Sequence, residues 1–283
     1  MSSLTTGNAE QYSDSQKLAA RARLASKYAI SEQPWFPWVA GHLPLKTGDR
    51  ILDVGCGPGW FWEAVAEAIP ARIDVTLTDL SPGMVEEAQM RCAPLPLSLV
   101  DSQVADAAAL PFEAGTFDGV LAMHMLYHMP DPAVAISEMF RVLKPGGFIA
   151  VTTNGMNNTR GLYELTTVFG GTPYDPAAAA FGFDEAERQL REQFGNVAGH
   201  RNITPMRVTS VEDVFLGLTS FPPGDRADEA QLAAFRAAID EAFSKGDGAL
   251  HVTKEAGLFL AIKAKMSGGF NDRSCAERPN AMA

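Results

Sequence analysis

The stretch that most constrains the fold of this chain runs from position 51 to 59 and reads Ile-Leu-Asp-Val-Gly-Cys-Gly-Pro-Gly. A short apolar segment, typical of a buried strand, breaks into three alternating glycines, and a helical pattern follows from Trp60. Glycines at such a turn permit left-handed backbone and let the chain approach a ligand closely. The pattern therefore predicts a central parallel strand followed by a loop that grips a ribose-bearing cofactor.

Short apolar segments alternate with helical patterns along most of the chain. Strands are expected at 50–54, 73–78, 97–104, 117–123, 148–153, 197–206 and 257–265, and helices at 14–30, 39–43, 60–69, 82–91, 131–143, 184–194, 211–218 and 229–243. Such alternation is typical of an open, doubly wound α/β sheet. The last strand is expected as an antiparallel addition at the edge of a mostly parallel sheet.

Composition limits the classes of partner. The chain has 283 residues, 46% of them hydrophobic, and a formal net charge of −11, so it can bury a large core but lacks a basic surface for nucleic acid. No segment approaches the roughly 20 apolar residues that span a bilayer, and the polar N-terminus lacks a signal-peptide core. Cys56, Cys92 and Cys275 show no zinc-motif spacing and are expected to be reduced. The sequence thus predicts a cytoplasmic protein without nucleic-acid or membrane partners.

The residues around the glycine loop narrow the choice of cofactor. The third glycine of a dinucleotide fingerprint would fall at Trp60, whose indole would crowd a pyrophosphate, and no Gly-Lys-Ser/Thr follows to bind a nucleoside triphosphate. Asp79 ends the second strand, where a carboxylate can accept hydrogen bonds from two ribose hydroxyls, and Leu80 can pack on a purine. Asp106 and the Ala107 N–H can read the adenine edge. Each acid alone has an ordinary explanation as a cap or surface residue, but their joint spacing at successive strand ends favours a nucleoside cofactor without phosphate.

Five short motifs lie within residues 45–155. They are Asp53-Val-Gly-Cys-Gly-Pro-Gly59, Thr78-Asp-Leu-Ser-Pro-Gly-Met84, Ala105-Asp106 with Leu110-Pro-Phe112, Phe117-Asp-Gly-Val120 and Arg141-Val-Leu-Lys-Pro-Gly-Gly147. As a set they resemble the class I S-adenosylmethionine-dependent methyltransferases. His-Met-Leu-Tyr-His after the fourth strand and Thr-Thr-Asn-Gly after the fifth make the chain similar to a small-molecule subgroup of that family.

The resemblance implies a Rossmann-like sheet of seven strands, the last one antiparallel, with N-terminal helices and a cap after the fifth strand. It also implies S-adenosyl-L-methionine at the carboxyl ends of the first strands. The residues implied near the methionine moiety are Asp53, Gly55, Cys56, Gly57, Gly59 and Met123. Tyr12 and Arg21 would close over the cofactor, with Arg21 either facing its carboxylate or lying on a solvated helix face.

The acceptor end of the site is expected beyond the fourth and fifth strands. Methyl transfer is a direct displacement that depends on in-line positioning, so a general base is optional. His124 and His128 are the candidate bases, although His128 would equally serve to pin its loop. The residues expected to position the acceptor are Trp35, Tyr127, Asn154 and Tyr163. The aromatic residues at 34–38 either fix the helices onto the sheet or roof an apolar pocket, and no set of His, Asp and Glu indicates a metal.

The sequence therefore predicts an enzyme that moves a methyl group from S-adenosylmethionine to an O or N nucleophile of a small, partly apolar molecule by in-line displacement. A C-methyltransferase of the same fold and a non-catalytic S-adenosylmethionine-binding protein are the alternatives. The expected organisation is a helical lid at 1–44, a cofactor-binding core at 45–155, a cap at 156–245, the final strand at 246–266 and a disordered tail at 267–283. No motif indicates the acceptor or the oligomeric state.

Overall fold

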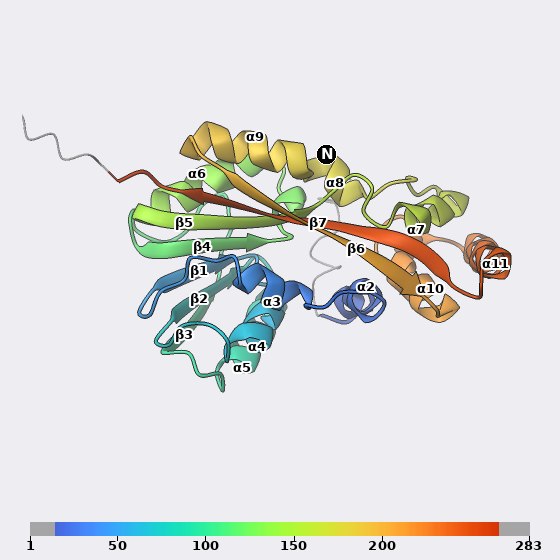
Figure 1. The fold of residues 1–283 in the computed structure, drawn as a ribbon, viewed down its shortest axis with the longest axis horizontal. Coiled ribbons are helices and arrows are strands. Elements are labelled where there is room, and N and C mark those ends of the chain that lie inside the picture. The colour runs from blue at the N-terminus through green and yellow to red at the C-terminus, as the bar shows by residue number, and fades with distance from the viewer. Residues whose placement is uncertain (1–14, 266–283) are drawn as a thin grey trace, which may run out of the picture.

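The computed structural model describes residues 15–265, and in this range seven strands form one sheet with helices on both faces (Figure 1). The strands are β1 (Arg50–Val54), β2 (Asp74–Asp79), β3 (Leu99–Val104), β4 (Phe117–Met123), β5 (Leu143–Asn154), β6 (Ala198–Val208) and β7 (Leu250–Ile262). Their order across the sheet is β3-β2-β1-β4-β5-β7-β6. β7 is antiparallel to both of its neighbours, and the pairs from β3 to β5 are parallel. The predicted seven-stranded, doubly wound α/β fold is confirmed.

The expectation that the last strand lies at the edge is wrong, because β7 lies between β5 and β6. It pairs with β5 from Ile262 to Ala256 and with β6 from Leu260 to Leu250. Residues Ala256 to Phe259 of β7 are all buried, as in a strand covered on both faces, whereas the second half of β6 alternates between exposed and buried residues. β6 is therefore the edge strand, although it comes earlier in the chain.

The helices lie on the two faces of the sheet and around the outer part of the β6–β7 pair. The described helices are α2 (Gln16–Lys27), α3 (Trp35–Ala40), α4 (Trp60–Val65), α5 (Pro82–Cys92), α6 (Pro132–Val142), α7 (Arg160–Leu165), α8 (Pro176–Phe181), α9 (Phe183–Phe194), α10 (Val211–Thr219) and α11 (Glu229–Lys245), with 3₁₀ turns η1 (Leu126–His128), η2 (Thr166–Phe169) and η3 (Gly224–Arg226). Within the described range no helix is both long and apolar enough to cross a membrane. α3 begins at Trp35 rather than at the expected 39, because Pro37 falls in the first turn, where its missing N–H has no intrahelical partner.

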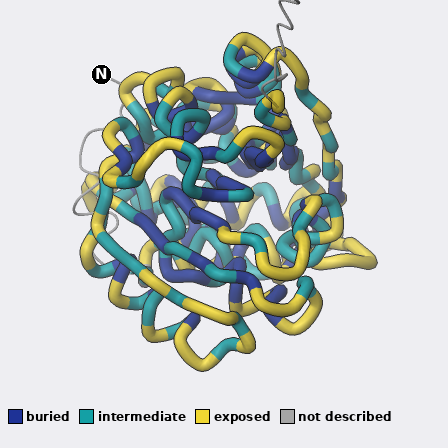
Figure 2. The backbone as a smooth tube through the Cα atoms, turned by 90° about the vertical axis from the view of Figure 1, so that its left-hand side faces the viewer, coloured by how far each residue is buried: buried dark blue, intermediate teal, exposed yellow. Residues whose placement is uncertain are grey.

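Two apolar clusters fill the space between the sheet and its helices. α6, α8 and α9 cover one face, and α3, α4 and α5 cover the other (Figure 1). Neighbouring residues of β1 serve opposite faces, since Leu52 belongs to the first cluster and Ile51 to the second. Figure 2 shows the buried backbone in dark blue toward the middle of the molecule and the exposed backbone in yellow toward its outside.

A third apolar cluster lies outside the sheet. It joins α2, α7, α10 and α11 to the far end of β6, where Met206 and Val208 are buried. Figure 1 shows these helices around the long β6–β7 pair, which extends well beyond β5. The range 156–245 thus contains both the cap helices and a strand of the main sheet.

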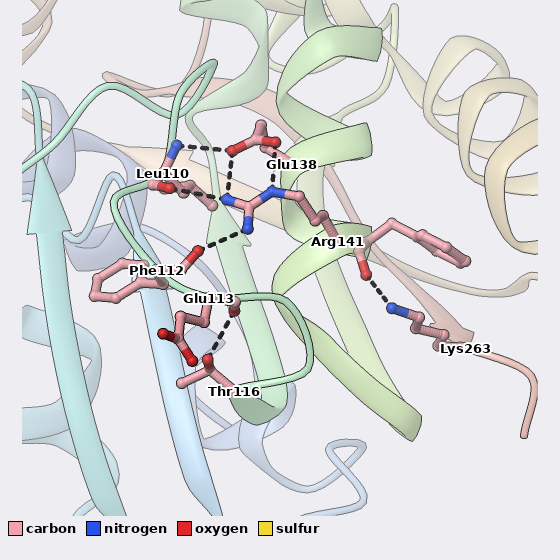
Figure 3. Close-up of polar contacts among 8 residues, drawn as sticks. Leu110, Phe112, Glu113, Thr116, Glu138, Arg141 and Lys263 are labelled. Atoms are coloured by element: carbon pink, nitrogen blue, oxygen red, sulfur yellow. Dashed lines mark hydrogen bonds and ion pairs between the residues drawn. The ribbon is translucent and has the colours of Figure 1, made fainter.

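Two of the sequence motifs meet at the loop that follows β3. Arg141 of α6 donates to the carbonyl oxygens of Leu110 (2.9 Å) and Phe112 (2.6 Å), while Glu138 accepts the Leu110 N–H at 3.0 Å (Figure 3). Glu138 also pairs with Arg141 at 2.7 Å. These contacts hold the loop that carries Asp106 against α6. This pair of motifs therefore has a structural role.

A second pair of motifs ties three strands together. Asp118 accepts the Arg50 N–H at 3.0 Å and pairs with the Lys144 ammonium at 2.8 Å. The neighbouring Gly119 allows close packing, because a Cβ there would lie 2.5 Å from the Phe148 ring. The relative positions of β1, β4 and β5, and hence of their carboxyl ends, depend on these contacts.

Candidate active site

The glycine loop leaves β1 through three left-handed residues. Gly55, Gly57 and Gly59 have φ angles of 68°, 52° and 78°. A Cβ at Gly55 would lie 2.7 Å from Met125 Cβ, and one at Gly59 would lie 3.0 Å from Cys92 Sγ, so both positions also exclude a side chain by contact. Gly57 is open, with only a Leu18 methyl group at 3.9 Å from such a Cβ. Gly57 is thus the glycine of this loop whose Cα has open space beside it.

Asp79 binds the loop from the next strand. Its Oδ2 accepts the Gly57 N–H at 3.0 Å and its Oδ1 accepts the Ser81 N–H at 2.9 Å. Burial raises the pKa of the carboxyl. Each oxygen of a carboxylate can accept more than one hydrogen bond, so Asp79 can hold the loop and still accept from a diol.

Asp53, at the end of β1, lies beneath the loop and is only 2% exposed. Its Oδ2 accepts the Trp62 Nε1–H at 2.9 Å, but its Oδ1 has no partner among the described residues. Burial raises the pKa of this carboxyl to about 7, and the negative charge of Asp79 adds to the effect. The sequence analysis did not single out Trp62 as a partner of Asp53, because an aromatic residue in a helix usually belongs to the hydrophobic core.

The purine side of the expected site is formed by loops after β2 and β3. Leu80 follows the end of β2 and is 66% exposed, so its apolar side chain is accessible to a ligand. Asp106 is exposed and its Oδ1 accepts the Ala108 N–H at 2.8 Å, while Ala107 is buried. These residues lie at the carboxyl ends of adjacent parallel strands, as predicted.

The methionine side of the expected site is bounded by Cys56, Met123 and α2. Burial raises the pKa of the Cys56 thiol well above its usual value, which keeps the thiol protonated. Met123 ends β4 and packs against the cluster under α3 and α4. Arg21 lies one helical turn after Leu18 and places its guanidinium 5.8 Å from the Phe221 ring. Tyr12 lies outside the described residues.

His124 and His128 flank the turn after β4. His124 has a left-handed backbone with φ of 53°, which is rare for a non-glycine residue, and its N–H donates to the Thr152 carbonyl at 3.1 Å. Burial, and then the charge of Lys254, lower the pKa of His124 to about 3, so its imidazole is neutral near pH 7 and a weak proton acceptor. The His128 ring lies 4.6 Å from the Tyr127 ring.

Asn154 and Tyr163 converge on a buried carboxylate that the sequence analysis missed. Asp175, at the start of α8, accepts the amide N–H groups of Asn154 (2.8 Å) and Asn158 (2.7 Å) and the Ala177 N–H (2.8 Å). Burial raises the pKa of both Asp175 and Tyr163. The Asp-Pro pair at 175–176 is a helix-start signal that predicts a cap at this position, but nothing in the sequence places it beside β5.

Trp35 stands at the other side of the same region. Its ring stacks on Trp38 with centroids 5.3 Å apart and lies 5.6 Å from the His124 ring. Lys254, from β7, places its Nζ 5.4 Å from the Trp35 ring centroid. Burial lowers the pKa of Lys254 to about 8. A single lysine in a strand carries no motif, so the sequence analysis missed it.

Phe169 of η2 is buried in the third apolar cluster, where its ring centroid lies 4.8 Å from that of Phe235. Among residues 15–265, no three His, Cys, Asp or Glu side chains are grouped so that they could hold a metal ion.

Comparison with known proteins identifies the family. The family described as "Methyltransferase domain" matches residues 52–151. The 27-O-demethylrifamycin SV methyltransferase of Amycolatopsis mediterranei is 40% identical over 114 residues, which are 40% of this chain and 41% of that protein. The ubiquinone biosynthesis O-methyltransferase of Xanthomonas oryzae pv. oryzae is 34% identical over 174 residues, covering 58% of this chain and 68% of that protein. The chain belongs to the class I S-adenosylmethionine-dependent methyltransferases.

The methyltransferase spans less than half the length of the Amycolatopsis relative and about two thirds of the Xanthomonas one. Among solved structures, Haemonchus contortus phosphoethanolamine N-methyltransferase 2 in complex with S-adenosyl-L-methionine has a TM-score of 0.57 at 21% identity, covering 94% of this chain and 60% of that one. This likeness shows a shared fold. Membership of the family makes the methyltransferase an enzyme.

Proposed function

We propose that the methyltransferase transfers a methyl group from S-adenosylmethionine to an oxygen or nitrogen nucleophile of a small, partly apolar molecule. The observation that carries the proposal is the Asp79 carboxylate, which is bonded to the glycine loop and lies beside the exposed Leu80. Oxygen is the favoured nucleophile, because both curated relatives are named for O-methyl chemistry.

The nucleoside would lie across the ends of β1, β2 and β3. Asp79 would accept from both ribose hydroxyls, and Leu80 would pack on the purine face. Asp106 and the Ala107 N–H would bind the amino edge of the adenine. The exposed apolar side chain of Leu80 supports this placement, because a bound purine would cover it.

The methionine moiety would lie over the glycine loop. The unpaired Asp53 Oδ1 fits a cationic group, which would satisfy a buried acceptor and lower the pKa of the carboxyl. Arg21 would pair with the cofactor carboxylate, and Met123 would lie near the sulfonium. When bound, S-adenosylmethionine supplies a methyl group on a positively charged sulfur, which makes that carbon electrophilic.

The remaining residues would bind and orient the acceptor. Trp35, Tyr127, Asn154 and Tyr163 would surround the acceptor beyond β4 and β5, and Asp175 contacts two of them, Asn154 and Tyr163. Buried walls exclude water and allow the acceptor atom to be held in line with the methyl group. A neutral His124 would donate or accept a hydrogen bond here, since its low pKa makes it a poor general base.

Calorimetric titration with S-adenosylhomocysteine tests the proposal. We expect the wild-type protein to bind it and Asp79→Ala to lose about 100-fold or more in affinity, because two charge-assisted hydrogen bonds, each worth about 1.5–3 kcal/mol, are removed. Asp106→Ala, at an exposed position, should lose about tenfold or less. Thermal melts of Asp79→Ala and Asp79→Asn separate loss of binding from loss of fold. Unchanged affinity in a folded Asp79→Ala protein would refute the ribose assignment, and a mass-spectrometric screen for methylated small molecules would identify the acceptor.

A further inference from the structure

Two hydrogen-bond donors beyond the end of β5 have no acceptor among residues 15–265. The Trp35 Nε1–H is buried and unpaired. The Lys254 ammonium lies 5.4 Å from the centroid of the same indole and forms no ion pair with any described residue. Buried donors are normally paired, so the Trp35 indole N–H, next to an ammonium that has no ion-pair partner among the same residues, requires an explanation.

The sheet register explains why Lys254 reaches this point. β7 pairs with β5 only as far as Asn154↔Ala256, so Lys254 lies two residues beyond the carboxyl end of β5, paired with Thr204 of β6. Side chains alternate along a strand, and Lys254 therefore shares a face with Leu258, which packs in the cluster under α3. The lysine is thus directed to the side of the sheet where α3 presents Trp35.

Among residues 15–265, no acidic side chain forms an ion pair with Lys254. His124, whose pKa responds to the lysine, is neutral. The adjacent Glu255 points to the other face of β7, where it accepts the Asn157 N–H at 3.1 Å. Contact with the indole face offsets only part of the cost of removing an ammonium from water. An anion is the ligand that this arrangement lacks.

We propose that Lys254 and the Trp35 indole N–H form the binding site for an anionic oxygen of the methyl acceptor. This inference rests on the proposed function and names the acceptor class: a small, largely apolar molecule with one ionised oxygen group, which is a phenolate, an enolate, a carboxylate or a phosphate. The aromatic residues next to Lys254 supply the apolar surroundings, and the ammonium supplies the discrimination against neutral analogues.

The reaction balances if the bound oxygen is the nucleophile. The acceptor hydroxyl loses its proton to water before transfer, and its oxyanion pairs with Lys254. The O–CH₃ bond then forms as the S–CH₃ bond breaks, and the sulfur keeps that bonding pair and becomes a neutral thioether. Lys254 remains protonated throughout. Because the negative charge disappears in the transition state, the ammonium acts by increasing the ionised fraction of the acceptor and by positioning it.

Binding of simple aromatic oxyanions, measured with saturating S-adenosylhomocysteine, tests the inference. The probes are 4-nitrophenolate, benzoate and phenyl phosphate, with nitrobenzene and benzamide as neutral counterparts. We expect the wild-type protein to bind at least one oxyanion more than tenfold better than its neutral counterpart, and the preferred probe tells a phenolate site from a carboxylate or phosphate site. Lys254→Met should abolish the preference, and Lys254→Arg should keep most of it.

Two controls make the result decisive. Lys245→Met removes an exposed lysine from the end of α11 and should leave oxyanion binding unchanged. Lys254→Met should leave affinity for S-adenosylhomocysteine within threefold and the melting temperature equal or higher, because an apolar side chain replaces a partly buried cation that has no ion-pair partner among residues 15–265. Oxyanion binding that is absent in the wild type, or unaffected in Lys254→Met, would overturn the inference alone. Failure of the wild type to bind S-adenosylhomocysteine would overturn the proposed function and the inference with it.

Discussion

The proposed cofactor end and the proposed acceptor end of the site are built in different ways. The glycine loop and Asp79 come from one βα unit, residues 50–79, and their contacts join positions close in the chain. The acceptor end brings together Trp35, His124, Asp175 and Lys254 from four separate segments. A motif can record the first kind of site, whereas only folding assembles the second.

The two ends also differ in charge. The cofactor end carries buried carboxyl groups with raised pKa values, Asp53 and Asp79, which suit hydroxyl donors and cations. The acceptor end carries a desolvated ammonium at Lys254 and a neutral imidazole at His124. We infer that one end selects a cationic donor and the other an anionic acceptor, and the following substitutions test how independent they are.

The largest effect is expected from Gly55→Ala, which would couple the two ends. The new Cβ would lie 2.7 Å from Met125 Cβ in the loop that follows β4, which we call the acceptor loop. The residue would also keep a φ of 68°. Overpacking and left-handed backbone together should cost about 2–4 kcal/mol of unfolding free energy. Affinity for S-adenosylhomocysteine, measured by calorimetry, should fall at least tenfold (about 1.4 kcal/mol).

Gly48→Ala is the matched control for Gly55→Ala. Gly48 has a φ of 86°, but a Cβ there would meet nothing within 4 Å. Backbone strain alone should cost about 1–2 kcal/mol and leave cofactor binding unchanged. Equal effects of the two substitutions would show that contact with the acceptor loop is unimportant.

Asp175→Ala should affect the acceptor end alone. It removes a helix cap and leaves the amides of Asn154 and Asn158 without their acceptor. We expect a loss of about 2–3 kcal/mol in denaturant unfolding. Asp228→Ala, which removes the exposed cap of α11, should cost about 1 kcal/mol. If Asp175→Ala also weakened S-adenosylhomocysteine binding more than threefold, the two ends would not be independent.

Asp53→Asn should give the smallest change in stability, with a characteristic pH dependence. Burial raises the pKa of Asp53 to about 7 in the folded protein, so its contribution to stability is present in full below the unfolded pKa and is lost as pH rises through about 7. At about pH 8 the variant should be more stable by about 1–2 kcal/mol, at most half of the roughly 4 kcal/mol that a shift from 3.8 to about 7 would give at about 1.4 kcal/mol per unit. Below about pH 4 the difference should vanish.

Melting curves across pH check this prediction, and Asp101→Asn on the exposed side of β3 is the control. Each kilocalorie should raise the melting temperature by about 2–4 °C. Calorimetry should show weaker S-adenosylhomocysteine binding in Asp53→Asn, since the anion beneath the loop is lost. A gain in stability that persisted at low pH would contradict the assignment of the raised pKa.

Local patterns predicted the elements of the sheet well. The spacing of apolar residues placed β1 and β4 at 50–54 and 117–123, as observed, because short buried strands next to glycines have few alternatives. It failed at β7, whose observed start at Leu250 lies in a polar stretch that pairs with β6 and not with β5. The strand was expected only where several apolar residues follow one another, so the first part of β7, which contains polar residues, was missed.

The sequence by itself determined the methyl donor's side of this protein. Left-handed glycines and strand-end acids are required at fixed positions in one βα unit, so their identity is written in consecutive residues. Only the tertiary structure decided the acceptor side, where Trp35 and Lys254 meet 219 positions apart through the register of β7 against β5. A lone lysine or tryptophan has no local conformational requirement, and its role depends on which neighbours the fold supplies.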